Sequence, residues 1–437
     1  MGNLNLKQNE ESALSSAKRS RCERSETHNW HTYYAGYSEA FVESAIKYLR
    51  CDRTTLLFDP WGGSGTTGMV ASRRGVPTVS IDINPVMATF AAAKSTAVLG
   101  FSDEITRFFR KLAVRRKATT RSDDPLLEMF DEDSTILIRS VISQIPFGSA
   151  DNSSAVLSRA QKVFQGGAAP IDPAYAFAMA VIFKTTRGLS AVKKGQNPTW
   201  IDLKDGQVSI TLDCLLTALR ENCEAMLSEL KRFYEAAGKA QHFTSLTADV
   251  RKLPVKDNSI SRIITSPPYL TRIDYAVSTK LELALFEDPN LLHVIRHRTI
   301  GAPVITKQEK KQNPMWGFLC NGVLDAIKAH STKAAASYYW KNIVQYFMDV
   351  DSALIELYRV LKPGGTGLIV VQSSYFKEIE IVLGDIYVQM AAARGFSSRI
   401  VYREEVNGHM AHVNTKSTMY KANKVYFEDF VYIEKPI

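Results

Sequence analysis

Five consecutive residues, Thr265-Ser266-Pro267-Pro268-Tyr269, bring together a small hydroxyl, two prolines and an aromatic ring. They follow Arg262-Ile263-Ile264, an apolar β-branched run that is typical of a buried strand. The strand must end at the prolines, because neither has a backbone N–H to donate to a neighbouring strand. A rigid turn that carries a hydroxyl beside an aromatic face is suited to holding a flat, polar ring. Taken alone, the same residues also fit an ordinary turn.

A second segment of interest is a glycine-rich loop. Its residues are Asp59, Pro60, Trp61, Gly62, Gly63, Ser64, Gly65, Thr66 and Thr67. It lies between an apolar run at 56–58, which predicts a strand, and residues 68–74, which predict a helix. Glycines let a backbone approach a ligand closely and adopt positive φ without steric cost. The next predicted strand ends in Asp82, about where nucleotide-binding βαβ units place an acid for ribose hydroxyls. Together, these features predict a ligand that contains adenosine.

The surroundings of the glycines narrow the type of ligand. No lysine follows them, so the loop does not fit the P-loop that cradles a triphosphate. Asp59, at the mouth of the loop, would repel a pyrophosphate but would suit a cationic ligand. S-adenosylmethionine, which carries adenine, ribose, a sulfonium and an ammonium group, meets these requirements.

The two loops together resemble those of the amino-methylating DNA methyltransferases, which modify the exocyclic nitrogen of cytosine or adenine. The family's cofactor loop is Asp-Pro-Phe-x-Gly-Ser-Gly-Thr, and residues 59–67 are similar to it, with Trp61 in place of Phe. The family's catalytic loop, (Asp/Asn/Ser)-Pro-Pro-(Tyr/Phe), is similar to Ser266-Pro267-Pro268-Tyr269. Looser similarities flank these loops, at residues 31–37, 248–259 and 359–365. The resemblance implies an α/β fold, with a Rossmann-like S-adenosylmethionine-dependent methyltransferase sheet and a mainly helical insertion.

The resemblance gives chemical roles to the catalytic loop. Methyl transfer from a sulfonium is an in-line displacement, to which a protein contributes mainly position and charge. An exocyclic amino group is a poor nucleophile, because its lone pair is delocalised into the ring. The Ser266 side-chain oxygen and the Pro267 carbonyl would accept its protons and expose the lone pair, and Pro268 would fix the direction of that carbonyl. Tyr269 would stack on a flipped base, an interaction worth about 1–3 kcal/mol.

The resemblance also implies which residues hold the cofactor. Asp82 would accept hydrogen bonds from the ribose hydroxyls, and Asp249 would contact the adenine amino group. Asp59 and His31 or Tyr33 would lie near the methionine end. The full set of expected cofactor contacts is His31, Tyr33, Asp59, Pro60, Trp61, Gly62, Gly63, Ser64, Gly65, Thr66, Thr67, Asp82, Asn84 and Asp249. For Asp249, a plain role as a turn or helix cap stays open.

The residue before the prolines bears on the target base. In the family, Ser at this position favours cytosine N4, whereas Asp or Asn favours adenine N6. The chain has no Pro-Cys dipeptide, which carbon-5 cytosine methyltransferases need for their thiolate nucleophile. We therefore expect a site-specific DNA cytosine-N4 methyltransferase of a restriction-modification or phage-defence system. A DNA adenine-N6 methyltransferase, an RNA amino-methyltransferase and a catalytically silent DNA-binding protein with the same fold stay open as alternatives.

The order of the two loops suggests how the 437 residues are organised. A chain of this length can hold two or more domains. Residues 1–25 are expected as a flexible basic tail and 26–100 as the cofactor half of the methyltransferase domain. Residues 101–240 predict mainly helices, and the resemblance makes this insertion the candidate target-recognition region. Residues 241–437 form the expected catalytic half, with an irregular basic insertion near 276–345.

The formal net charge of +9 favours a polyanionic partner, here double-stranded DNA. The expected DNA contacts are Arg110, Lys111, Arg115, Arg116, Lys193, Lys194 and Trp200. Such cations could follow phosphates, and an aromatic ring among them could stack on a base. A solvated helix face, with Trp200 in the core of the insertion, would explain the same residues. A cognate restriction endonuclease or another defence-system protein is a further expected partner.

The cysteines and the hydropathy of the chain further limit the class of protein that we expect. The five cysteines, Cys22, Cys51, Cys214, Cys223 and Cys320, are scattered without close spacing. We therefore expect neither a disulfide framework nor a metal site. No apolar run is long enough to span a bilayer, and the N-terminus lacks an apolar signal core. A cytoplasmic protein is expected, with S-adenosylmethionine as its cofactor, no metal and no membrane contact.

Overall fold

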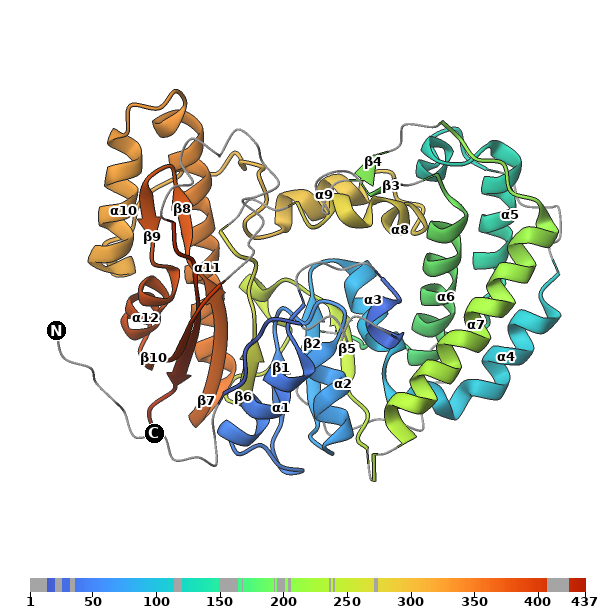
Figure 1. Ribbon diagram of the computed structural model, residues 1–437, viewed down its shortest axis with the longest axis horizontal. Helices are drawn as coiled ribbons and strands as arrows, with labels where there is room; N and C mark the ends of the chain where they lie inside the picture. Colours follow the sequence, from blue (N-terminus) through green and yellow to red (C-terminus); the bar gives the residue numbers. More distant parts are fainter. Residues whose placement is uncertain are drawn as a thin grey trace.

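A seven-stranded sheet forms the centre of the protein, and helices cover it and extend from one of its edges (Figure 1). The computed structural model describes residues 14–19, 26–31, 36–113, 120–148, 164–166, 168–191, 193–194, 201–202, 206–235, 237–238, 240–270, 274–406 and 424–437. In spatial order, the strands are β10 (Ser397–Glu405), β11 (Phe427–Glu434), β7 (Leu361–Gln372), β6 (Ile260–Thr265), β1 (Leu57–Asp59), β2 (Thr78–Asp82) and β5 (Thr244–Thr247).

Strand direction divides this sheet into two parts. Strands β5, β2, β1, β6 and β7 run parallel to one another, whereas β11 runs antiparallel to both β7 and β10. The central strand β1 is buried along its whole length. Such burial on both faces is typical of a parallel sheet between two helical layers. The α/β class and the Rossmann-like sheet predicted from the sequence are confirmed.

The path of the chain places a crevice at the middle of the sheet. From β1 the chain runs outwards to β2 and β5, and it then crosses to the other side of β1 to add β6 and β7. Such a reversal leaves room for a ligand at the carboxyl ends of the strands that flank it. These strands are β1 and β6, and they lead into the glycine loop (residues 59–67) and the proline loop (residues 265–269). The topology therefore brings together two loops that are far apart in the sequence.

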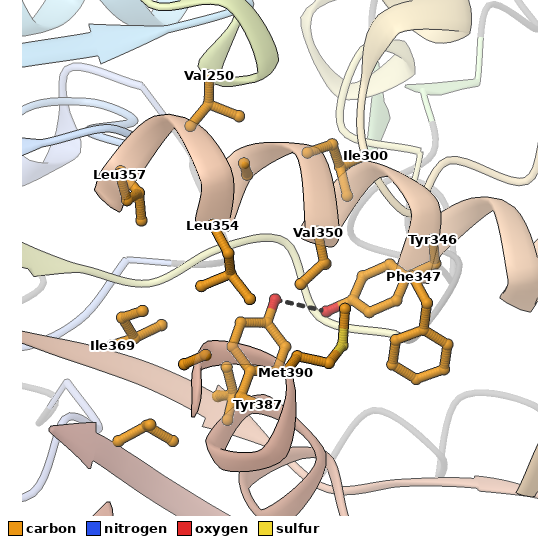
Figure 2. Close-up of a cluster of buried hydrophobic side chains, with 14 of the residues drawn as sticks. Val250, Ile300, Tyr346, Phe347, Val350, Leu354, Leu357, Ile369, Tyr387 and Met390 are labelled. Atoms are coloured by element: carbon orange, nitrogen blue, oxygen red, sulfur yellow. Dashed lines mark hydrogen bonds between the residues drawn. The ribbon is translucent and has the colours of Figure 1, made fainter. Parts of the chain in front are cut away.

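One apolar core fixes the face of the sheet beneath the proline loop. It joins Phe58 of β1 to helices α11 (Trp340–Val360) and α12 (Leu383–Ala393). Figure 2 shows Val350 and Leu354 of α11 facing side chains of α12 in this core. The long helix α11 therefore has a fixed position under the part of the sheet that leads into the proline loop.

A second core covers the opposite face. It joins Leu57, the neighbour of Phe58, to α1 (Glu39–Tyr48) and α2 (Thr66–Arg73). Leu57 and Phe58 serve different cores because successive side chains of a strand point to opposite faces. Helix α1 begins at Ser38, whose hydroxyl accepts a hydrogen bond from the Phe41 N–H (3.0 Å). Helix α2 begins directly at the end of the glycine loop.

Residues 101–240 contribute a group of helices that we call the helical lobe. Its members are α4 (Ser102–Lys111), α5 (Glu132–Ile142), α6 (Pro173–Leu189) and α7 (Leu212–Glu235). Helix α6 packs on α3 (Pro85–Ala93) of the cofactor half, α7 packs on α6, and α4 packs on α7. One apolar core runs through these helices, α3 and residues 276–295. The lobe thus shares its core with the sheet domain, and its role in target recognition stays a prediction.

The stretch near 276–345, expected to be irregular, is largely helical in the structure. It contains α8 (Lys280–Ala284), α9 (Leu291–Arg298), α10 (Gly317–Ala329) and a π-helical turn (Ala335–Tyr339) that leads into α11. Helices as short as α8 and α9 offer too few positions for a clear apolar period, and contacts to larger cores stabilise them instead. In Figure 1, α8 and α9 lie between the helical lobe and α11.

The N-terminal segment also differs from the expected flexible tail where it is described. Leu14 and Ala17 are buried in the core beneath α1. The Ala17 carbonyl accepts a hydrogen bond from the Ser38 N–H (2.8 Å), and Ser16 Oγ donates to Glu404 of β10 (2.6 Å). These apolar residues stand within a polar, basic stretch, and this composition hid the packing of residues 14–19.

Two short antiparallel pairs complete the structure: β3 (Lys193–Lys194) with β4 (Ile201–Asp202), and β8 (Ser374–Phe376) with β9 (Ile379–Ile381).

Over the described residues, no helix is both long and apolar enough to cross a membrane. The same residues hold no group of three or more His, Cys, Asp or Glu side chains placed to bind a metal ion. Of the cysteines, Cys51, Cys214, Cys223 and Cys320 are free thiols.

Candidate active site

A pocket opens at the carboxyl edge of the sheet, where β1, β2, β5 and β6 end. Its empty volume is about 760 Å³, counting the solvent at its open mouth. The predicted site residues that line it are Pro60, Trp61, Asp82, Asn84, Asp249, Ser266, Pro267, Pro268 and Tyr269. The glycine loop and the proline loop therefore face one cavity.

The glycines let their loop pack tightly between β2 and α3. A Cβ on Gly62 would lie 1.7 Å from Ser80 Oγ, and a Cβ on Gly65 would lie 2.9 Å from the Ala91 Cα. Gly65 has a φ of +90°, a left-handed conformation that favours glycine. Ser64, Thr66 and Thr67 are buried. Residues 62–67 are not among the residues that line the pocket, and their cofactor contacts stay predictions.

Asp59 ends β1 and is engaged entirely by the protein. Its Oδ2 accepts hydrogen bonds from Tyr37 Oη (2.7 Å) and from Thr67 Oγ1. Its Oδ1 accepts from Thr265 Oγ1 (2.7 Å) and from the Trp61 N–H (3.2 Å). Burial raises its pKa, and these hydrogen bonds oppose that shift. The side chain is 1% exposed and is absent from the pocket lining, so the geometry supports a structural link between β1, β6 and α2.

Asp82 ends the neighbouring strand β2 and lines the pocket. Only backbone groups hold its carboxylate among the described residues: the Gly63 N–H (3.0 Å) and the Asn84 N–H (2.8 Å). Burial raises its pKa to about 6, with those two hydrogen bonds opposing the shift. A carboxylate can accept about four hydrogen bonds, so it retains capacity for donors in the pocket. Asn84, next to it, caps α3 through the Val86 N–H (3.0 Å).

Asp249 lies beyond β5, where it caps a short helix and lines the pocket, and its contact with adenine stays a prediction. Its Oδ1 accepts from the Arg251 N–H (3.0 Å), which caps the 3₁₀-helix Val250–Lys252. The Arg251 guanidinium also donates to both carboxylate oxygens (2.9 and 2.7 Å). Burial alone would raise the pKa of Asp249, but Arg251 outweighs it and the pKa is lowered. The carboxylate is therefore ionised, and it lines the pocket where β5 ends.

Ser266 and Pro267 of the proline loop line the pocket, and both carry hydrogen-bond acceptors. Ser266 has one hydroxyl proton, and both acceptors within its reach belong to the protein: the Val370 carbonyl (3.2 Å) and Tyr269 Oη (3.4 Å). With the proton committed there, the Ser266 oxygen retains lone pairs for a donor in the pocket. No donor in the described ranges reaches the Pro267 carbonyl. The two atoms predicted to hold an amino group are thus both available as acceptors.

The remainder of the loop is anchored at both ends. The Pro268 carbonyl accepts a hydrogen bond from Tyr346 Oη (3.1 Å), and Tyr346 is in turn joined to Tyr387 (3.2 Å, dashed in Figure 2). Tyr269 Oη donates to Glu428 Oε1 on β11 (2.8 Å). Burial and the nearby Glu428 raise the pKa of Tyr269 far above its usual value. Tyr269 is therefore a neutral aromatic wall of the pocket.

His31 lies away from the pocket, in a buried ionic cluster. Its Nε2 is 3.7 Å from Glu282 of α8, too far for a hydrogen bond. Glu282 pairs with Arg187 of α6 (2.6 Å between Nη2 and Oε2). Burial lowers the pKa of His31, which favours the neutral ring. His31 therefore joins the N-terminal region to the helical lobe, while Tyr33, the alternative for the methionine end, lies outside the described residues.

The expected DNA contacts are described only in part. Arg110 and Lys111 form the last turn of α4. Arg110 pairs with Glu224 of α7 (3.1 Å), and α7 and α6 separate α4 from α3. Arg115, Arg116, Trp200 and the side chains of Lys193 and Lys194 lie outside the described residues. Their contacts with DNA stay predictions.

Several pocket residues gave no signal in the sequence. They include Tyr275 after the proline loop, and Arg298, Thr299 and Ile300 at the end of α9. They come from the stretch expected to be irregular, where no motif marks a site. Glu428 was also missed, although an acid within the apolar run 427–433 could have marked it, since buried strand positions seldom carry a charge.

No protein-family model matches the chain. Among curated proteins, it is similar to the type II methyltransferase M.BsoBI of Geobacillus stearothermophilus, with 22% identity over 318 residues. The match covers 65% of this chain and 58% of the length of that protein. The chain is thus related in sequence to part of a methyltransferase.

Two solved structures show a looser overlap. The rRNA methyltransferase aviRa from Streptomyces viridochromogenes matches with a TM-score of 0.32, 12% identity and 96% coverage of both chains. The YcgJ protein from Bacillus subtilis matches with a TM-score of 0.31, 8% identity, and coverage of 90% of this chain and 96% of its own. Overlaps of this quality carry no information on what the chain binds.

Proposed function

We propose that the protein is an S-adenosylmethionine-dependent methyltransferase that modifies the exocyclic amino group of a flipped DNA base, with cytosine N4 as the favoured target. The observation that carries the proposal is the pocket that Asp82 and the proline loop line together. The sequence similarity to a type II methyltransferase supports the reaction class. A role in restriction-modification or phage defence, with double-stranded DNA and a cognate endonuclease as partners, belongs to the same proposal.

The pocket has the donors and acceptors that S-adenosylmethionine requires. Asp82 would accept the ribose hydroxyls, because this residue lines the pocket and its carboxylate has spare lone pairs. Asp249, which is ionised, would accept the adenine amino group. Trp61 and Pro60 would pack along the cofactor, and the region of residues 62–67 would surround its methionine part. When bound, the cofactor supplies an electrophilic methyl group.

The proline loop would prepare the nucleophile. Ser266 Oγ and the Pro267 carbonyl would accept the two amino protons of the base, which draws the nitrogen away from conjugation with the ring. Both acceptors are preorganised, since Ser266 is held by Val370 and the following proline fixes the backbone. Preorganised dipoles of this kind reduce the activation free energy because they need no rearrangement during the reaction. Tyr269 would stack on the flipped base and hold it in line with the methyl group.

The choice of cytosine rests on the acceptor at position 266. A serine hydroxyl is a neutral acceptor, and it accepts a weaker hydrogen bond than the carboxylate or amide found at this position in relatives that favour adenine. Tyr275 and Ile300, which also line the pocket, would further limit the size of the base.

The test is nucleoside analysis after reaction. Unmodified DNA is incubated with the protein and S-adenosylmethionine, digested, and examined by mass spectrometry, with RNA as a parallel substrate. N4-methylcytosine is the expected product. N6-methyladenine alone would reject the cytosine assignment, and a product found only in RNA would reject DNA as the substrate. The absence of any methylated base would count against the enzyme itself.

A further inference from the structure

A buried acid lies directly behind the catalytic aromatic ring. Glu428 of β11 is 8% exposed, and its Oε1 accepts the hydrogen bond from Tyr269 Oη (2.8 Å). Residue 428 is paired with Glu404 of the neighbouring strand β10 in the antiparallel register. Side chains of directly opposed residues lie on the same face of a sheet. Two carboxyl groups therefore meet at one point behind the pocket.

A like charge held this close disfavours the ionised form of Glu428. Burial raises the pKa of Glu428 to about 7, and Glu404 adds to the shift while the hydrogen bond from Tyr269 opposes it. Glu404 is itself held by Ser16 Oγ (2.6 Å) and Tyr402 Oη (3.2 Å), and Lys18 is the cation that acts on Glu428. The acid pair is thus built from β10, β11 and the N-terminal segment.

The pair controls the direction of the hydrogen bonds that reach the pocket. Because Glu428 accepts the Tyr269 proton, Tyr269 Oη keeps a lone pair for Ser266, 3.4 Å away. Ser266 can then direct its proton to Tyr269 or to the Val370 carbonyl, and both directions lead away from the pocket. Without an acceptor at position 428, the Tyr269 hydroxyl would compete with the target amino group for the Ser266 oxygen.

We propose that Glu428, supported by Glu404, is a positioning residue that fixes the Tyr269 ring at the pocket wall and keeps Ser266 an acceptor. The consequence for catalysis rests on the proposed function, whereas the anchoring of the ring does not. Glu428 itself does not line the pocket, so it acts through Tyr269 and would not touch the cofactor.

The test compares Glu428→Leu, Tyr269→Phe and the double variant in steady-state methyl transfer. Each single variant should lower kcat/KM by about tenfold, the upper end of what one hydrogen bond is usually worth. The double variant should lose no more than the larger single loss, because all three remove the same contact. Affinity for S-adenosylmethionine, measured by calorimetry, should stay within about twofold of the wild type, which a general loss of folding would not produce.

The matched control is Glu405→Leu, an exposed acid next to Glu404 on β10, which should leave transfer unchanged. Glu428→Gln should retain more activity than Glu428→Leu, because its amide oxygen can still accept the Tyr269 proton. Where Glu428→Leu does not fold, Glu428→Asp replaces it, since this side chain keeps the carboxyl group but is one methylene shorter.

Full activity of Glu428→Leu, or single losses that multiply in the double variant, would overturn the proposal. Should the wild type transfer no methyl group, the proposed function fails, and crystal structures then decide the anchoring. A Tyr269 ring displaced in Glu428→Leu, with the wild-type ring in place, would support it. An unmoved ring would reject it.

Discussion

The glycine loop and the proline loop end neighbouring strands of one sheet, but they use their polar groups in opposite ways. In the glycine loop, Asp59 accepts hydrogen bonds from Tyr37, Thr67, Thr265 and the Trp61 N–H, and its oxygens are turned into the protein. In the proline loop, Ser266 directs its proton into the protein and leaves acceptors for the pocket. The first loop therefore holds strands together, and the second prepares a surface for a ligand.

Asp59 and Asp82, the acids that end β1 and β2, show the same contrast. Asp59 is buried behind the pocket wall, whereas Asp82 has only backbone partners and lines the pocket. Two carboxylates at the ends of adjacent strands can thus serve structure and binding separately. Substitution of each aspartate should separate the two roles. The largest effect is expected for Asp59, on the free energy of unfolding.

Replacement of Asp59 tests the structural side. Asp59→Ala should lower the free energy of unfolding by about 3–5 kcal/mol, because it leaves a set of buried donors without their acceptor. Asp82→Ala should cost much less, about 1 kcal/mol, since it frees only the Gly63 and Asn84 N–H groups near a pocket that admits water. Urea denaturation of both variants measures the difference. Equal losses would remove the distinction between the two acids.

Replacement of Ser266 tests the proline loop. Ser266→Ala should lower kcat for methyl transfer by about 100-fold, as expected for removal of one preorganised hydrogen-bonding group from an active site. Its affinity for S-adenosylmethionine should not change, because the hydroxyl serves the target base. Single-turnover kinetics and calorimetry check the two statements. A wild-type rate in this variant would show that the proline loop does not act on the amino group.

Replacement of Asp82 tests the proposed role of this acid in cofactor binding. Asp82→Ala should weaken the affinity for S-adenosylmethionine by about tenfold, since it removes an acceptor of the ribose hydroxyls. Isothermal titration calorimetry gives the affinity, with Ser266→Ala as a variant that should bind like the wild type. Undiminished binding by Asp82→Ala would place the ribose elsewhere.

The pH dependence of cofactor binding gives the smallest effect. The pKa of Asp82 is raised to about 6, so its carboxylate is mostly protonated at pH 5 and mostly ionised at pH 7. Ribose hydroxyls bind the ionised form more strongly. The affinity for S-adenosylmethionine should therefore rise a few-fold as the pH increases from 5 to 7, and the rise should be absent in Asp82→Asn. A rise that persists in this variant would assign it to another group.

Sequence reasoning predicted best what is local in the chain. The strands that end in Asp59, Asp82 and Thr265, and the helices that follow the first two, depend on short apolar runs and on glycine and proline signals within a few residues. The resemblance predicted that the two loops share one site. The strand order explains why they meet, because β1 and β6 are neighbours in the sheet. The contacts assigned to each site residue stay predictions.

Partners far apart in the sequence could not be predicted. The carboxylate of Asp59 was expected to face a ligand. One of its oxygens accepts a hydrogen bond from Thr265, which is 206 positions away in the sequence. Glu428 joins the proline loop only because β11 inserts between β7 and β10. Similarly, α8 and α9 are too short to show a period of their own, and their burial against the helical lobe decides their structure. Such contacts depend on the assembled fold.

A crystal structure with S-adenosylmethionine bound would test the central claim most directly. We predict that the ribose hydroxyls donate to Asp82, that the adenine amino group lies against Asp249, and that the methyl group points toward Ser266 Oγ and the Pro267 carbonyl. A cofactor bound away from this pocket, or with its methyl group directed away from the proline loop, would contradict a methyl-transfer site between the two loops.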